Sequence, residues 1–239
     1  MRLVLALVVG AAVIAAPSVA QEEPRAERAE QLYVTGCSSC HGIDGKGTDQ
    51  APSLENSGAA GAYYYLETGR MPMTDVEGQP RRKSPAYSPE EIELLVEFVA
   101  ALGDGPDIPE VDVNEGDLAE GGVLFRANCA PCHAAAGIGG ALSYGRAAPG
   151  LHESNPEVIA AAVRIGPGQM PVFDDDVFDE QELASIVRYA RYLDSPETPG
   201  GAALGGAGPI PEGFVAWVLG IGTLLLATLW IGRRMGEQE

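Results

Sequence analysis

The sequence has few basic residues, histidines and cysteines. Each shortage excludes some binding partners or limits the side chains that could form a metal site. Its 239 residues hold 15 Lys and Arg against 34 Asp and Glu, which gives a formal net charge of -19. An acidic surface repels phosphate, so a nucleic-acid partner is not expected. With three histidines, four cysteines and five methionines, any metal site must be built from a small set of side chains.

Strand-like alternation of apolar and polar residues is also missing from the sequence. No stretch shows it convincingly, and long apolar runs occur only at the two ends. The sequence therefore predicts an all-α fold. The polar middle has the length of two small domains rather than one large one.

All four cysteines lie in two Cys-x-x-Cys-His motifs, at residues 37–41 and 129–133. In this motif each thiol can add to a vinyl group of one haem, and the histidine can bind the iron. A redox pair, a disulfide or a zinc half-site also uses Cys-x-x-Cys. These do not need the adjoining histidine, and a zinc site would bring the two pairs together. The sequence predicts two covalently bound c-type haems, each adding apolar core to a domain of about 80 residues that has little core of its own.

The second axial ligand of each iron is found by elimination. The third histidine, His152, follows a Pro-Gly-Leu loop and is expected at the surface or beside a haem propionate. Apart from the initiator and one methionine beyond the C-terminal apolar run, the candidates are Met71, Met73 and Met170. Met71 and Met170 each lie in a Gly-x-Met-Pro tetrapeptide and are the expected ligands, with Met73 as the alternative to Met71.

Ligation by His and Met raises the reduction potential and fills both axial positions, which favours electron transfer over catalysis at the iron. The predicted haem-binding residues are Cys37, Cys40, His41 and Met71 in the first unit and Cys129, Cys132, His133 and Met170 in the second; the iron ligands among them are His41, Met71, His133 and Met170.

The two motifs have matching surroundings. Tyr33 and Phe125 each stand four residues before the first cysteine, so each is expected on the haem side of a helix, the first of which is predicted over 22–34. The carbonyls of Pro52 and Pro149 are expected to accept a hydrogen bond from the second ring nitrogen of the histidine.

A capped helix is predicted to close each unit. Ser88 and Asp179 are placed as N-caps, and glutamates three residues later complete capping boxes before apolar stripes. The predicted organisation is a signal peptide or N-terminal anchor over 1–20, class I cytochrome c domains over 27–103 and 118–195, linkers over 104–117 and 196–212, a transmembrane helix over 213–231 and a cytoplasmic tail over 232–239.

The two ends indicate export and membrane attachment. The run over 1–20 ends in small residues, typical of a secretory signal, and is just long enough to be a retained anchor. The run over 213–231 has tryptophans near both ends and is followed by Arg233 and Arg234. These arginines place the C-terminus in the cytoplasm and both haem domains on the outer side of the cell membrane.

Two charged clusters lie after the methionine loops. One is basic, at residues 81–83, and the other is acidic, at residues 174–176 with Asp179. Such runs are usually solvated surface. Their opposite signs nevertheless suggest different docking partners, because rim charges steer encounter.

The order of these parts resembles the dihaem cytochrome c subunit of the actinobacterial-type cytochrome bc1 complex. The segments that carry the resemblance are residues 32–37, 69–73, 121–125, 170–173, 208–217 and 229–232. The resemblance implies a subunit of a quinol–cytochrome c reductase, without substrate chemistry of its own at the haems, that works with a cytochrome b and a Rieske iron-sulfur subunit.

In that family, the first haem would accept electrons from the Rieske protein and the second would deliver them to an aa3-type terminal oxidase. Members often keep the N-terminal apolar segment as a second anchor. The alternatives are a dihaem subunit of a terminal oxidase such as a cbb3-type assembly, a free-standing membrane-tethered shuttle, and a dihaem peroxidase or dehydrogenase. The C-terminal anchor disfavours the cbb3-type subunit, and the paired methionines disfavour the enzymes with an open iron.

Overall fold

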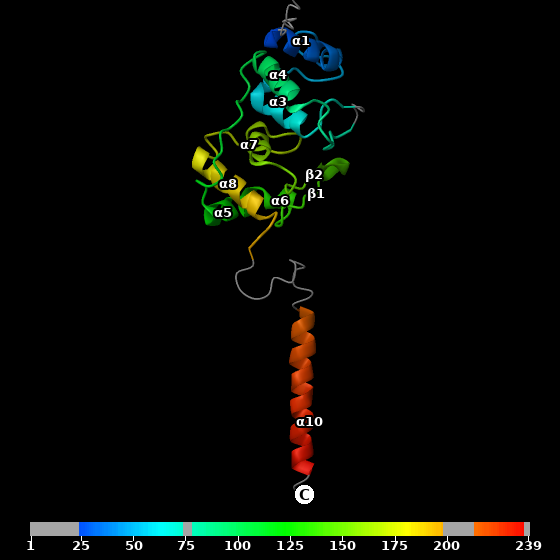
Figure 1. The fold of residues 1–239 in the computed structure, drawn as a ribbon, viewed down its shortest axis with the longest axis vertical. Helices are drawn as coiled ribbons and strands as arrows, with labels where there is room; N and C mark the ends of the chain where they lie inside the picture. Colours follow the sequence, from blue (N-terminus) through cyan, green and yellow to red (C-terminus); the bar gives the residue numbers. More distant parts are fainter. Residues whose placement is uncertain (1–23, 74–77, 198–212, 237–239) are drawn as a thin grey trace, which may run out of the picture.

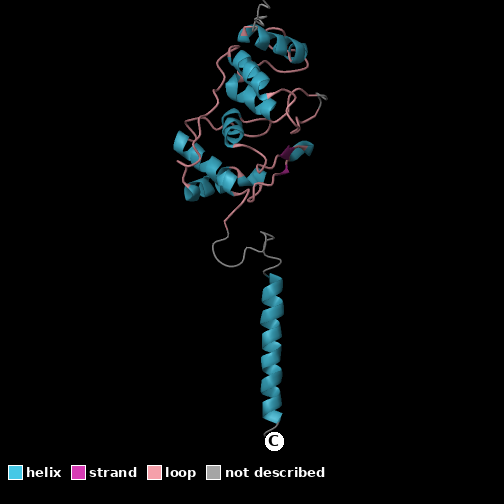
Figure 2. Cartoon of the chain, in the orientation of Figure 1, coloured by secondary structure: helices cyan, strands magenta, loops and turns pink. Residues whose placement is uncertain are grey.

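The computed structural model describes residues 24–73, 78–197 and 213–236 (Figures 1 and 2). The predicted signal or anchor over 1–20 and most of the linker over 196–212 lie outside these residues. The elements, in chain order, are α1 (Arg25–Gly36), α2 (Ser38–His41), α3 (Gly58–Glu67), α4 (Pro89–Ala100), α5 (Leu118–Asn128), α6 (Ala130–His133), β1 (Gly140–Ala141), η1 (Ser143–Gly145), β2 (Ala147–Ala148), α7 (Pro156–Ile165), α8 (Glu180–Tyr192), η3 (Ala216–Ile221) and α10 (Gly222–Gly236).

In the first unit, α1 and α3 both pack against α4. Tyr33 is fully buried and stacks on Phe98 with ring centroids 4.6 Å apart. Around it lies a core of Ala62, Leu66, Ile92, Leu95 and Val99. Helix α1 ends two residues later than predicted, because the Cys37 N–H donates to the Tyr33 carbonyl at 2.8 Å and joins the helix directly to the first motif.

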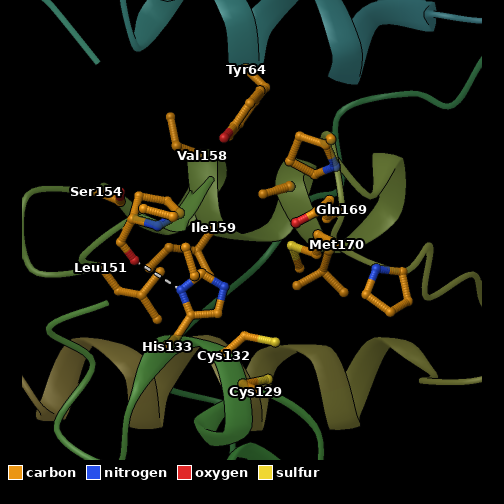
Figure 3. Close-up of a pocket in the computed structure, with 18 of the residues that line it drawn as sticks. Tyr64, Cys129, Cys132, His133, Leu151, Ser154, Val158, Ile159, Gln169 and Met170 are labelled. Carbon is orange, nitrogen blue, oxygen red and sulfur yellow. Dashed lines mark hydrogen bonds between the residues drawn. The ribbon is translucent and has the colours of Figure 1, made fainter. Parts of the chain in front are cut away.

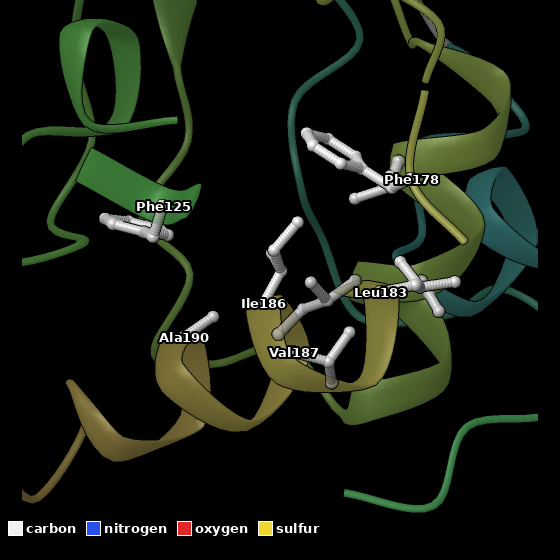
Figure 4. Close-up of a cluster of buried hydrophobic side chains, with 9 residues drawn as sticks. Phe125, Phe178, Leu183, Ile186, Val187 and Ala190 are labelled. Carbon is white, nitrogen blue, oxygen red and sulfur yellow. The ribbon is translucent and has the colours of Figure 1, made fainter. Parts of the chain in front are cut away.

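In the second unit, α5 and α8 form the most extensive helix–helix contact of the described residues. The core includes Phe125, Phe178, Leu183, Ile186, Val187 and Ala190 (Figure 4). Ser185 of α8 is fully buried in this crossing. Its Oγ donates to the carboxylate of Glu120 at 3.0 Å and accepts the N–H of Asp117 at 2.9 Å, which fixes the start of α5 on α8.

The crossing depends on a glycine. A Cβ at Gly121 would overlap the backbone carbonyl of Ser185. We expect Gly121→Ala to lower the free energy of unfolding of the second unit by about 1–3 kcal/mol, the usual cost of overpacking a tight contact. Urea unfolding of the detergent-solubilised chain measures it. Gly122→Ala is the matched control, because its Cβ would meet side-chain atoms of Tyr189 and Arg126 that can move; equal destabilisation by both variants would contradict the prediction.

Both closing helices begin as predicted. Ser88 accepts from the Glu91 N–H while the Glu91 carboxylate accepts from the Ser88 N–H, and Asp179 and Glu182 do the same for α8. The described residues are mostly helical, in agreement with the all-α prediction, and contain one small addition. Residues 140–141 and 147–148 form a two-stranded antiparallel ribbon, which is too short to show an alternating pattern in the sequence.

Helices α3 and α7 were not predicted, and they join the two units. They pack on each other (Figure 1) through a cluster of Ala60, Tyr64, Val158 and Ala161. The Asn155 amide donates to the Tyr63 hydroxyl at 3.2 Å across this contact. The linker takes part as well, since the Pro106 carbonyl accepts the N–H of Ala60 at 3.0 Å. The two units are therefore packed against each other and are not connected by the linker alone.

Residues Gly213–Arg234 form one apolar helix of 22 residues, none of whose membrane-length window is buried in the protein. At about 1.5 Å per residue it reaches about 33 Å, enough to cross the roughly 30 Å hydrocarbon core of a bilayer. The Arg234 guanidinium lies 4.7 Å from the centroid of the Trp230 ring near its end. Length and composition thus agree with the predicted transmembrane helix.

Candidate haem sites

The second unit contains a cavity in which the predicted second site comes together. Cys129, Cys132, His133 and Met170 all line it. His133 lies on α6, and Met170 lies in the loop after α7. Figure 3 shows the two side chains directed into the same space, with the cysteines beside His133. Most of the remaining wall is apolar, as a porphyrin face requires, and includes Phe125, Leu151, Val158, Ile159, Val163 and Ile186.

Each motif histidine is oriented by a proline carbonyl, as predicted. The Nδ1 atom of His41 lies 2.9 Å from the Pro52 oxygen, and that of His133 lies 2.9 Å from the Pro149 oxygen. A carbonyl can only accept, so Nδ1 carries the proton and the Nε2 lone pair remains available to bind a metal. Both histidines are only 9% exposed.

The methionine loops bring thioethers to both cores. Met71 and Cys37 pack against the core around Tyr33, whereas Met73 does not contact this core. The Met71 N–H donates to the Tyr65 carbonyl at 3.0 Å, which holds its loop on α3. In the second unit Met170 and Cys129 pack against the core that contains Phe125. The structure thus favours Met71 over Met73 as the candidate ligand.

The four thiols are free. Burial, and secondarily the neighbouring thiol, raises the pKa of Cys37 to about 11 and that of Cys129 to about 11. Both thiols therefore remain neutral near pH 7. Among residues 24–73, 78–197 and 213–236, no group of three or more His, Cys, Asp and Glu side chains is arranged so that it could hold a metal ion, so the two Cys pairs do not form a joint zinc site.

Two thiols for covalent attachment, one free imidazole lone pair and one thioether around an apolar space match the groups that haem c requires. This set is complete at the second cavity. In the first unit, Cys37 and Met71 pack on the same core and the Pro52 carbonyl orients His41. Phe125 lines the second cavity, as predicted for the aromatic one turn before the motif.

Sequence reasoning missed that the first unit builds part of the second cavity. Tyr64, Tyr65, Arg70, Gln79 and Pro80 all belong to the wall of that cavity. The Gln79 side-chain amide donates to the Ala147 carbonyl at 2.8 Å and accepts its N–H at 2.9 Å, which anchors this wall on β2. No local sequence pattern predicts such a contact, because the contact depends on how α3 and α7 pack.

His152 and the basic cluster both make contacts within the protein. His152, expected at the surface or beside a haem propionate, is partly exposed and is not among the residues that line the second cavity; its Nε2 lies 2.8 Å from the Ala136 carbonyl. In the basic cluster at 81–83, Arg82 donates to Ser154 Oγ at 2.8 Å and to the Glu153 carbonyl. That arginine therefore holds the two units together, while Arg81 remains exposed.

The acidic cluster also has an internal role. Asp175 pairs with Arg164 at 2.6 Å, and the buried Arg164 donates to the carbonyls of Phe173 and Phe178 at 2.9 Å each. These bonds fix the segment that follows Met170. One member of the cluster at 174–176 thus stabilises the methionine loop, whatever docking role the others have.

Comparisons with known proteins agree with this geometry. Residues 26–103 match the family described as Cytochrome c, and residues 116–189 match the family described as Cytochrome C oxidase, cbb3-type, subunit III. A cytochrome c6 of Leptolyngbya boryana is 39% identical over 84 residues, which cover 34% of this chain and 95% of that protein. The chain thus contains two cytochrome c domains, and such domains imply covalently bound haem c.

Longer matches cover both units. The cytochrome bc1 complex cytochrome c subunit of Mycobacterium leprae is 40% identical over 228 residues, covering 91% of this chain and 79% of that one. The subunit of the same name from Corynebacterium diphtheriae is 36% identical over 237 residues, covering 91% and 84%. The chain therefore belongs to the family of cytochrome c subunits of the cytochrome bc1 complex, and its function is in electron transport.

Proposed function

We propose that the chain is a two-haem relay within a quinol–cytochrome c reductase. The first unit, with Cys37, Cys40, His41 and Met71, accepts electrons from a Rieske iron-sulfur protein. The second unit, with the corresponding residues 129, 132, 133 and 170, passes them to a terminal oxidase of the aa3 type. The haem iron, when bound, supplies reversible one-electron chemistry.

The observation that carries this proposal is the junction between the units. Helices α3 and α7 pack together, and side chains of the first unit line the cavity of the second. Two haem sites held in one packed body have a fixed separation, so transfer between them does not wait for a diffusive encounter. A single polypeptide also keeps both sites at a high effective concentration relative to each other.

Within each site the protein's own residues fix the ligands. The Pro52 and Pro149 carbonyls hold the imidazoles in one tautomer and orientation. The thioethers of Met71 and Met170 would be the second protein ligands of the two haem irons, and a thioether ligand favours the reduced iron and leaves no place for a substrate. The chain's contribution is thus to tune and position two electron carriers.

The membrane helix gives the proposal an orientation. Arg233 and Arg234 follow the apolar run and lie in the last turn of α10. By the excess of basic residues on the cytoplasmic side, the C-terminus is cytoplasmic and both haem units lie outside the cell membrane. This is the side on which a reductase would deliver electrons to an oxidase.

Purification tests the proposal. We expect the tagged full-length chain, extracted in mild detergent, to bring down a cytochrome b and a Rieske subunit. The match of residues 116–189 to a cbb3-type oxidase subunit supports one rival, in which the chain belongs to an oxidase. Recovery of oxidase subunits without cytochrome b would favour that rival, and recovery of the chain alone would favour a free-standing shuttle.

A further inference from the structure

Arg70 is a buried arginine that lacks a carboxylate partner in the described protein. The residue is 7% exposed, and its Nη1 is buried with no hydrogen-bond partner among the residues that the structure describes. Its guanidinium carbon lies 4.9 Å from the centroid of the Tyr64 ring, which offers an aromatic face but no negative charge. The ion pairs of the described residues do not include Arg70. A buried charge without a partner lowers the stability of the folded protein, so an anion bound beside Arg70 would be stabilising.

The anion would have to come from within the second cavity. Arg70 and Tyr64 both line it, although they belong to the first unit, and Figure 3 shows Tyr64 reaching the cavity from α3. The described lining contains two arginines and no aspartate or glutamate, in a chain with 34 of them. The other lining arginine, Arg146, is exposed to solvent. The wall beside Arg70 is therefore suited to receive carboxylate groups.

Neighbouring cations do not substitute for Arg70. Arg82, which belongs to the basic cluster at 81–83, is already bonded to Ser154 and to the Glu153 carbonyl. The loop that carries Arg70 is also fixed, since the Lys83 N–H donates to the Thr68 carbonyl at 3.1 Å and the next residue, Met71, is bonded to Tyr65. Arg70 is thus held in place on the cavity wall.

We propose that Arg70 of the first unit binds a propionate carboxylate of the haem that the second unit holds. The inference rests on the proposed function, in which the second unit holds a haem. A guanidinium matches a carboxylate with two parallel hydrogen bonds, and the pair is strong where water is excluded. Because Met71 is the candidate ligand of the first haem, residues 70 and 71 would contact both haems. The positive charge favours the reduced form of the second haem and so draws electrons toward the second unit.

Redox titration of the full-length holoprotein in detergent tests the proposal. In Arg70→Gln we expect the equilibrium constant for reduction of the second haem to fall about tenfold, the effect of removing one charge at about 10 Å in an effective dielectric of about 20. For one electron this is a shift of about 59 mV. Arg70→Lys should keep most of the wild-type potential. Arg81→Gln is the matched control, since it removes one exposed arginine near the same loop and should shift neither haem appreciably.

A redox titration of the two-haem protein gives one transition for each haem. A Met170→Ala variant, in which only the second haem is altered, shows which transition belongs to the second haem. A shift confined to the first haem, or equal shifts in Arg70→Gln and Arg81→Gln, would overturn the proposal. If Arg70→Gln does not accumulate, Arg70→Lys is examined by resonance Raman, where the propionate bending band of the second haem must move. An unmoved band overturns the proposal too. A wild-type chain with a single haem would instead refute the proposed function, whereas two haems with unshifted potentials remove only the role of Arg70.

Discussion

Replacing both Cys129 and Cys132 by serine is expected to leave one covalently bound haem per chain instead of two. Serine hydroxyls do not add to haem vinyl groups, so the second unit loses its means of covalent attachment. His133 and Met170 can hold a haem only by coordination, which denaturation breaks. Pyridine haemochrome spectra after denaturation and gel filtration measure the remaining haem against chain concentration.

The reciprocal variant is the control for this experiment. Replacing Cys37 and Cys40 by serine should remove the first haem and leave the second. Each cysteine pair would then account for half of the covalently bound haem of the wild-type chain. The half-occupied chains should also differ in potential, because the second cavity contains Arg70. Two covalent haems in either double variant would show that the motifs do not carry the attachment.

Met170→Ala should abolish the weak near-infrared sulfur–iron band of the second haem and lower its reduction potential. The thioether stabilises reduced iron, and axial ligands set haem potentials over a range of roughly 0.8 V, so a drop of a substantial part of that range is expected. The opened position should also bind carbon monoxide in the reduced state. Near-infrared absorption and redox titration provide the two measurements.

Met73→Ala is the matched control on the first unit. Met71 packs on the core beside Cys37, and Met73 is absent from that contact, so Met71→Ala should remove the band of the first haem and Met73→Ala should leave it. A band lost in the Met73 variant would reverse this assignment. Retention of both bands in Met170→Ala would exclude a thioether at the second iron.

The parts of the fold that could be predicted are those with local signals. Helices α4 and α8 start at capping boxes formed by Ser88 with Glu91 and by Asp179 with Glu182, which are readable within four residues. The orientation of the two motif histidines was predicted from a proline in the loop after each motif, although Pro52 lies 11 residues after His41 and Pro149 lies 16 residues after His133; both proline carbonyls are where they were expected.

Helix α3 could not be predicted in this way. Its N-cap residue Ser57 makes no side-chain capping bond, and its two glycines and three tyrosines offset the helical propensity of its alanines. Its stability comes from burial against α4 and α7. Asn155 caps α7 and Pro156 occupies its first turn. The start of α7 could therefore have been predicted from the sequence.

The contribution of one unit to the other's cavity could not be read from sequence at all. Arg70, Gln79 and Tyr64 look like ordinary loop and core residues until α3 lies on α7. The same is true of Arg82, whose position in a run of basic residues suggested a docking surface but whose bonds cross the junction. Tertiary packing decides which charges of a run face solvent.

A shared wall has a consequence for how the protein matures. The second cavity is complete only when Tyr64, Tyr65 and Gln79 are in place, and these belong to the part of the chain that is synthesised first. With the outer location proposed above for both units, the first unit would leave the cytoplasm before the second motif and could fold before the second haem is attached. Folding and cofactor insertion would proceed in sequence from the N-terminus, with the earlier domain acting as an intramolecular template for the later one.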